Sequence, residues 1–263
     1  MKTHPRQPLP HGSHSAVSSI VALTALLWGY HAGAASLLTV NLGTSAGFAV
    51  LAGAGITIEA PANSTSVTGD IGSHSTVSIT GLENLILNGV NHAGDAVTQS
   101  AKTDLMLAYI DAASRPSGIS YASGHDLTGT LTTGVYSTGG SLSLGGVLTL
   151  DGLGNPDSVW IFQMGSSLDV ASPGSVVFIN GADPSRVFWQ VGSSATFETG
   201  SNFAGNILAS QSITFKTGSS LTGRALASVG AVTLGGTTIA IPEPSALIFG
   251  LAGALVIGFK RRR

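Results

Sequence analysis

The chain has 263 residues, of which only 9% are charged, and its formal net charge is −2. Cysteine is absent, which excludes disulfides, thiolate metal sites and cysteine nucleophiles, and no basic stripe is available to bind nucleic acid. Sparse charge together with 36 glycines and abundant Ser, Thr and β-branched residues favours an all-β protein with many tight turns.

The N-terminal segment, 1–34, has the pattern of a signal peptide. Lys2 and Arg6 precede an apolar run from Ala16 to Trp28, and Ala32-Gly33-Ala34 supplies the small–x–small pattern that a signal peptidase accepts. An uncleaved N-terminal anchor is the alternative, but the apolar run is short for a membrane span of ~20 residues. We therefore predict cleavage after about Ala34, and export of the remaining chain.

The segment from Ala93 to Ala113 carries the strongest helix signal in the chain. It contains no Pro and no Gly beyond position 94, and Arg115-Pro116 ends it. We predict an α-helix over about 93–114, whose small residues let it lie close against a flat sheet. Apolar residues recur at helical spacing, at Val97, Ala101, Leu105 and Ala108/Tyr109, and the small residues are Ala101, Ala108 and Ala112.

After the helix the chain repeats itself every ~18–19 residues, most clearly from Val187 to Gly223. Each repeat holds three short strands separated by Gly and Ser, which is typical of a triangular β-solenoid. A β-sandwich would show longer strands and no such self-similarity. The first strands of successive repeats are 159–165, 187–192, 206–211 and 224–230, and the second strands are 167–171, 194–199, 212–217 and 231–234.

Alternation along each strand assigns the faces of the solenoid. In the second strand Ala195 and Phe197 point inward, so Thr196 and Glu198 point outward. Glu198 and Lys216 occupy matching places on successive repeats, where an ion pair would control the register of the strands rather than act as a catalytic dyad. In the first strand the outward set is apolar, and we predict that the helix covers it: Ile161, Phe188, Leu208 and Leu226.

The C-terminal segment, 241–263, forms a distinct tail. Pro242-Glu243-Pro244 is followed by an uncharged apolar segment, 245–259, and then by the basic end 260–263. This order resembles the PEP-CTERM sorting signal of Gram-negative bacteria. The resemblance implies transient membrane anchoring through the apolar segment, processing by an exosortase, and display at the cell surface or release into the extracellular matrix.

A second resemblance covers residues 39–240. In chain order the segments LGTSAGFAVLAG (42–53), VTGDIG (67–72), LTTGVY (131–136), VWIFQ (159–163), VFWQVG (187–192) and GRALA (223–227) are similar to the ice-binding-like family of secreted microbial proteins, of the ice-binding protein 1 type. The resemblance implies a discontinuous right-handed β-solenoid over 35–240 with a long α-helix alongside. It also implies a non-enzymatic protein without cofactors whose partner is the surface of an ice crystal.

Members of that family that bind ice use a flat face of small and hydroxylated residues, and some share a Thr-(Ala/Gly)-x-(Thr/Asn) motif. Thr199-Gly200-Ser201-Asn202 fits this motif, whereas Thr217-Gly218-Ser219-Ser220, one repeat later, ends in Ser. The second face offers threonines interrupted by Glu198 and Lys216, so the sequence favours the third face. We predict that the ice-binding residues are Thr199, Asn202, Ala204, Thr217, Ser220, Thr222 and Thr238.

Three other interpretations remain in view. The third-face residues could be turn-adjacent polar residues on a solvated solenoid, and the protein could be an adhesive matrix or biofilm protein that binds exopolysaccharide or cell surfaces. Asp151, Asn155 and Asp157 loosely resemble a calcium loop but match no full spacing, so we predict no metal site. The remaining acids, histidines and serines form no acid–base pair, ligand set or nucleophile elbow, and we predict no enzymatic activity.

Overall fold

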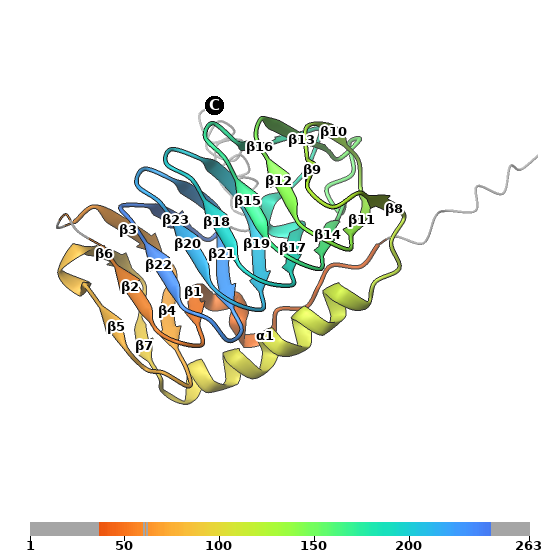
Figure 1. Ribbon diagram of the computed structural model, residues 1–263. Helices are drawn as coiled ribbons and strands as arrows, with labels where there is room; N and C mark the ends of the chain where they lie inside the picture. The colour runs from red at the N-terminus through yellow and green to blue at the C-terminus, as the bar shows by residue number, and fades with distance from the viewer. Residues whose placement is uncertain (1–36, 60, 62, 243–263) are drawn as a thin grey trace, which may run out of the picture. The chain divides into compact units, whose positions relative to one another are not determined.

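The computed structural model describes residues 37–59, 61 and 63–242 (Figure 1). The described chain is dominated by parallel β-sheets and holds one α-helix, α1 (Ala96–Ser114), which confirms the predicted fold class at this level. Three short 3-10 helices join the strands: η1 (Gly43–Gly47), η2 (Leu82–Asn84) and η3 (Pro184–Arg186).

The strands pair in three parallel ladders, named here by their order along each repeat. The helix-side ladder runs β7 (Asn91–Ala93), β4 (Asp70–Ser73), β1 (Phe48–Ala52), the second halves of β21 (Ser220–Ala227) and β19 (Asn202–Ala209), β17 (Val187–Val191), β14 (Trp160–Met164), β11 (Gly134–Thr138) and β8 (Ile119–Tyr121).

The second ladder runs β5 (Ile79–Thr80), β2 (Ile56–Ile58), β22 (Val232–Leu234), β20 (Ile213–Phe215), β18 (Ala195–Phe197), β15 (Leu168–Val170), β12 (Leu142–Leu144) and β9 (His125–Asp126). The third ladder runs β6 (Leu85–Asn88), β3 (Thr65–Thr68), β23 (Thr238–Ala240), the first halves of β21 and β19, β16 (Ser175–Ile179), β13 (Val147–Asp151) and β10 (Gly129–Leu131).

The order of repeats in space differs from their order in sequence. β1, β2 and β3 pair with β21, β22 and β23, so the first strands of the chain are joined to the last ones. Helix α1 then carries the chain from β7, at one end of the helix-side ladder, to β8 at the other (Figure 1). Its 19 residues span ~28 Å at ~1.5 Å per residue.

The space between the ladders is filled by the inward-facing side chains. Tyr136, Phe162 and Trp189 stack on successive repeats with ring centroids 5.3 and 4.0 Å apart. The indole Nε1 of Trp189 donates to the carbonyl oxygen of Ala204 at 2.9 Å, so this buried polar group is satisfied. Phe197 and Phe215 stack in the same way on the second ladder, 4.5 Å apart.

Helix α1 covers the outer side of the helix-side ladder, as predicted. Leu105 and three alanines of the helix are at most 1% exposed, and one apolar cluster joins them to the ladder. The expected inner face is wrong at one position: Val97 is 45% exposed, and Thr98 is buried against Gly72 instead. The alanines are Ala101, Ala108 and Ala112, and their partners include Ile161, Phe188, Leu208 and Leu226.

The helix begins at Ala96 rather than at 93, because Asp95 caps it. Asp95 is in an extended conformation and its Oδ1 accepts from the backbone N–H of Thr98 at 2.9 Å, which satisfies one of the free donors of the first turn. Ala93 has a φ of +46°, incompatible with a helix. Strand geometry therefore persists up to the cap.

Two side chains fasten the helix to the strands further along. The ammonium of Lys102 donates to the carbonyl oxygens of Ala227 and Ser228 at 2.6 and 2.5 Å, and burial lowers the pKa of Lys102 to about 8. The amide of Gln163 donates to the carbonyl oxygens of Ala112 and Arg115 at 2.8 and 2.7 Å. The free carbonyls of the last helical turn are thereby satisfied.

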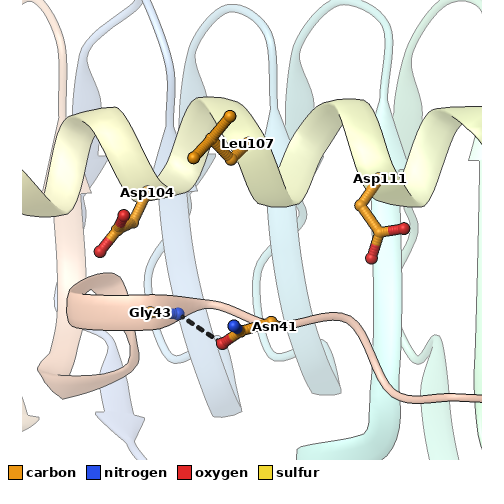
Figure 2. A pocket seen from close by; sticks show the side chains of 5 residues that line it. All are labelled: Asn41, Gly43, Asp104, Leu107 and Asp111. Carbon is orange, nitrogen blue, oxygen red and sulfur yellow. Dashed lines mark hydrogen bonds between the residues drawn. The ribbon is translucent and has the colours of Figure 1, made fainter.

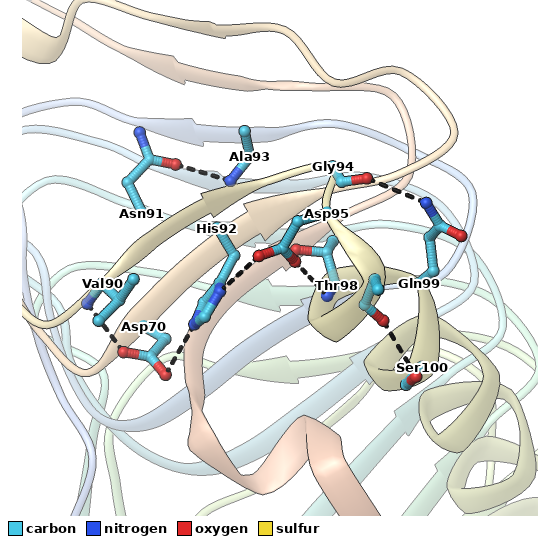
Figure 3. Close-up of polar contacts among 11 residues, drawn as sticks. Asp70, Val90, Asn91, His92, Ala93, Gly94, Asp95, Thr98, Gln99 and Ser100 are labelled. Carbon is cyan, nitrogen blue, oxygen red and sulfur yellow. Dashed lines mark hydrogen bonds and ion pairs between the residues drawn. The ribbon is translucent and has the colours of Figure 1, made fainter.

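His92 links the helix cap to the helix-side ladder (Figure 3). Its Nδ1 lies 2.9 Å from Asp95 Oδ2 and its Nε2 lies 3.4 Å from Asp70 Oδ2. Asp70 Oδ1 in turn accepts from the backbone N–H of Val90 at 2.8 Å. The hydrogen bond to Asp95 is the main cause that raises the pKa of His92 above 6.5, desolvation opposes it, and Asp70 adds to the rise.

This cluster predicts a pH-dependent stability. Because the pKa of His92 is higher in the folded state, the stabilisation by its charge is complete below the ordinary pKa of 6.5 and is lost as the pH rises through the raised value. We expect the Tm advantage of the parent chain over His92→Gln to be larger at about pH 5.5 than at about pH 8.5. Thermal unfolding at both pH values measures it, and an equal advantage at both would contradict the assignment.

The cover of the ladder predicts a contrast between two leucines of the helix. Leu105 is 0% exposed and Leu107 is 58% exposed. Leu105→Ala removes buried methyl groups and leaves a cavity, so we expect it to lower the free energy of unfolding by about 2–5 kcal/mol. Leu107→Ala is the matched control and should change it by less than about 0.5 kcal/mol in denaturant titrations.

Candidate functional site

The outward face of the second ladder carries a column of threonines. The strand register places Thr80, Thr57, Thr233, Thr214 and Thr196 side by side on five consecutive repeats. Each sits at the same position of its strand, so the five hydroxyls and five methyl groups repeat at the strand spacing of ~4.7–4.9 Å. We call these five residues the threonine column.

Two features border the threonine column. On one side lie small residues that immediately precede each strand and join successive repeats through backbone hydrogen bonds: Ser78, Gly55, Ala231, Ser212, Ser194 and Ser167. Along the column itself, the next repeat after Thr196 carries Asp169, and Asp126 follows two repeats later. The uncharged stretch therefore ends at the carboxylate of Asp169.

On the other side the column is bordered by an ion pair. Lys216 Nζ lies 2.6 Å from Glu198 Oε1 and 2.8 Å from Oε2, which confirms the predicted pairing between successive repeats. Both side chains are well exposed, at 48% and 42%. Because each charge is neutralised by its partner, the border of the column carries no net charge at this point.

The corner between the second and third ladders is built from Thr-Gly turns. Gly200 and Gly218 have φ of +73° and +72°, a conformation that glycine adopts without strain. Thr199 and Thr217 stand exposed beside them. Two predicted ice-binding residues therefore lie on this corner rather than on a flat face.

The third ladder brings together the other predicted residues. Thr238, Ser220 and Asn202 are register neighbours in one outward column, and Ser220 Oγ donates to Asn202 Oδ1 at 3.0 Å. Thr222 is exposed in the next column. Ala204, its register neighbour, is only 4% exposed, because a single methyl group beside the longer Thr222 does not reach the surface. The prediction that Ala204 is presented outward is therefore wrong.

The third ladder also has apolar residues on its outer side toward the β13 end. Val147, Val177 and Ile179 are 51%, 42% and 38% exposed. The second ladder has no large exposed apolar side chain among its described strand residues. The two open faces thus differ: the second carries a uniform column of one residue type, and the third carries mixed short polar and apolar residues.

A concave site lies beside the helix (Figure 2). It encloses about 230 Å³ and is lined by Asn41, Gly43, Asp104, Leu107 and Asp111. Asp104 accepts from the backbone N–H and hydroxyl of Thr44 at 2.7 and 2.6 Å, and these bonds lower its pKa. Asp111 accepts from Arg115 at 2.8 Å. Both carboxylates therefore already have partners in their own chain.

The loosely calcium-like segment is a set of turns. Asp151 Oδ1 accepts from the backbone N–H of Leu153 and from Asn180 Nδ2 at 2.8 and 2.9 Å. Asp157 accepts from Arg186 at 2.7 Å. Within the described ranges no group of three or more His, Asp or Glu residues could hold a metal ion.

Several predicted features lie outside the described residues: the signal peptide 1–34, Glu243 and Pro244 of the sorting motif, the apolar segment 245–259 and the basic end 260–263. Pro242 is the last described residue. Among helices in the described part of the chain, none is long and apolar enough to cross a membrane.

Sequence reasoning missed Thr57 and Thr80. A signal for them exists, since Ile56-Thr57-Ile58 and Ile79-Thr80 show the same apolar–Thr alternation as Ile213-Thr214-Phe215. The two segments precede the helix, whereas the recognised repeat follows it. Only the strand pairing reveals that they belong to one column.

Comparison with known proteins finds a family model, ice-binding-like, that matches residues 50–240. An ice-binding protein of Nostoc sp. is 43% identical over 178 residues, which are 65% of this chain and 62% of that protein. An ice-binding protein of Flavobacterium frigoris is 33% identical over 221 residues, 78% and 77% of the two chains. The match thus covers less than two thirds of the Nostoc protein.

Solved structures agree. The crystal structure of an ice binding protein from an Antarctic biological consortium superposes with a TM-score of 0.75 at 40% identity, over 79% of this chain and 93% of that one. The ice-binding protein of the Antarctic ascomycete Antarctomyces psychrotrophicus gives 0.73 at 34% identity, over 78% of this chain and 100% of that one.

The exposed ion pair predicts a small stability effect. Replacing both partners, Glu198→Thr with Lys216→Thr, removes a solvent-screened interaction worth under about 1 kcal/mol, and threonine suits a strand edge. We expect the free energy of unfolding of the double variant to stay within about 1 kcal/mol of the parent in denaturant titrations. A larger loss would mean that the pair, not the ladder, holds the register here.

Proposed function

The chain belongs to the ice-binding-like family, and we propose that it adsorbs to the surface of ice crystals without catalysing a reaction. Adsorbed protein would inhibit the growth or recrystallisation of ice outside the cell. The observation that carries this proposal is the threonine column on the second ladder.

The chemistry of the column supports adsorption to ordered water. Each threonine offers a hydroxyl and a methyl group, and the strand ladder repeats both at ~4.7–4.9 Å, close to the repeat of oxygen atoms on ice planes. Because the backbone is held by the ladder and threonine has few χ1 rotamers, little conformational entropy remains to be lost on adsorption. The column is a preorganised array.

The absence of charge along the column supports the same proposal. A charged side chain orients water around itself and would disturb an ice-like layer. From Thr80 to Thr196 the outward position of the strands is threonine in every repeat. The first charge in the column is that of Asp169.

Two surfaces compete for the contact with ice. We propose the threonine column as the main one, because one residue type recurs there without interruption. The residues predicted from the sequence form the second candidate, with the Thr-Gly corner joining the two: Thr199, Thr217, Asn202, Ser220, Thr222 and Thr238, whereas Ala204 is buried.

The finer fold assignment and the route of export are part of the proposal. Three parallel ladders and their discontinuous order support a triangular, right-handed β-solenoid of the kind the resemblance implies. The terminal motifs support cleavage by signal peptidase, sorting by an exosortase at 242–244, and an extracellular or cell-surface location in a Gram-negative bacterium. Anchoring by 245–259 and contact with exopolysaccharide stay predictions.

The two surfaces can be separated with a matched pair of substitutions in the full chain, Thr214→Tyr and Thr222→Tyr. Both replace a threonine on an outer face, so both should fold, and circular dichroism checks this. We expect the parent to inhibit ice recrystallisation and Thr214→Tyr to lose activity by about tenfold or more, because a bulky ring lifts neighbouring threonines off the flat lattice. Thr222→Tyr should stay within about twofold of the parent.

The other outcomes are decisive too. No inhibition by the folded parent chain would contradict ice adsorption. Loss of activity in Thr222→Tyr alone would assign the contact to the third ladder, and full activity in both variants would exclude both surfaces.

A further inference from the structure

The outward side of helix α1 carries no charged residue. Each charged side chain of the helix is held by its own chain instead: Lys102 by the carbonyl oxygens of Ala227 and Ser228, Asp104 by Thr44, and Asp111 by Arg115. The exposed residues are Ala96, Val97, Gln99, Ser100, Thr103, Met106, Leu107, Ile110, Ala113 and Ser114. A surface helix ordinarily presents charged or polar residues to water.

Three large apolar side chains are concentrated on this side. Met106, Leu107 and Ile110 are 55%, 58% and 55% exposed. Leu38, 71% exposed, lies near the helix end, where its carbonyl oxygen accepts from Arg115 at 3.2 Å. Single exposed apolar residues are ordinary, but a contiguous stripe marks an interaction surface.

The spacing of the stripe fits a second helix. Ala96, Ser100, Thr103, Leu107, Ile110 and Ser114 follow one another at alternating intervals of four and three positions. This is the spacing of the seam along which two helices pack. Nothing in the described chain covers the seam, and α1 is the outermost element on its side of the sheets (Figure 1).

We propose that the seam binds the same seam of a second copy of this chain, with the two helices antiparallel and a two-fold axis near Leu105. In this register Leu107 faces Thr103 of the other copy and Ile110 faces Ser100, so each large side chain meets a short one. The ends match as well, with Ala96 against Ser114. A two-fold contact repeats every residue on both sides, and a seam without charges avoids like-charge repulsion.

The chemistry of the stripe favours a second copy over a lipid surface. Helices that bind anionic membranes carry Lys or Arg beside their apolar face, whereas Lys102 is turned inward and Arg115 is paired with Asp111. A contact ~28 Å long is at the small end of stable interfaces, so a weak dimer is expected. Both open ladders stay free in such a dimer.

Cysteine cross-linking tests the proposal and its register in the full chain, which has no cysteine of its own. Ser100→Cys and Ile110→Cys are mixed under a glutathione redox buffer. Antiparallel pairing predicts a disulfide-linked dimer in the mixture. Each variant alone should stay unlinked, because its two copies of the cysteine lie ~15 Å apart along the helices, beyond the ~7 Å that a disulfide spans between Cα atoms.

Sedimentation of the full chain gives a second, independent measurement. We expect the parent to associate and Leu107→Glu to be monomeric with an unchanged Tm, because Leu107 is exposed in the single chain. Leu153→Glu, at an exposed loop position of 70%, is the matched control and should associate like the parent.

Four results would overturn the dimer: a monomeric parent, cross-linking of either cysteine variant alone, no cross-link in the mixture, or association that persists in Leu107→Glu. Phosphatidylcholine vesicles identify the other occupant, since a monomeric parent that binds them and loses binding in Leu107→Glu would assign the stripe to lipid. The outcome is independent of ice binding, which neither readout measures.

Discussion

The structure depends on one constraint: parallel strands of successive repeats pair in register. Equivalent residues are therefore stacked in columns at ~4.7–4.9 Å, and a residue that suits one repeat must also suit its neighbours above and below. Thr214 stands between Thr233 and Thr196, and Phe215 between Leu234 and Phe197. The threonine column, the aromatic stack and the Glu198–Lys216 pair are three consequences of the same stacking.

The same constraint accounts for the scarcity of charge. Like charges at the strand spacing repel one another, so a charged column would destabilise the ladder unless its signs alternated. The chain has only 11 basic and 13 acidic residues, and those in the ladders are few or paired, as at Glu198. Others serve as fasteners of the helix, as Lys102 and Asp95 do. Faces without charge are thus a requirement of the fold before they are a feature of function.

The sequence was sufficient where contacts are local. From Val187 to Gly223 the repeat predicted the inward aromatics, the Glu198–Lys216 pair and the apolar face that needs a cover, because neighbours in space are only one repeat apart along the chain. It was insufficient where pairing is long-range: Thr57 joins Thr233 across the whole domain, and no period links them. Ala204 failed for another reason, since alternation gives the direction of a side chain but not whether it reaches the surface.

The helix resolves a conflict that the ladders create. Three apolar-cored ladders need three outer faces, and one of them presents Ile161, Phe188 and Leu226, which water cannot cover favourably. Helix α1 buries this face, and its anchors at Asp95 and Gln163 hold both of its ends. The second and third ladders are then left open on a rigid support. A flat array for ordered water requires this rigidity, because any mobility of the supporting strands would have to be lost on adsorption.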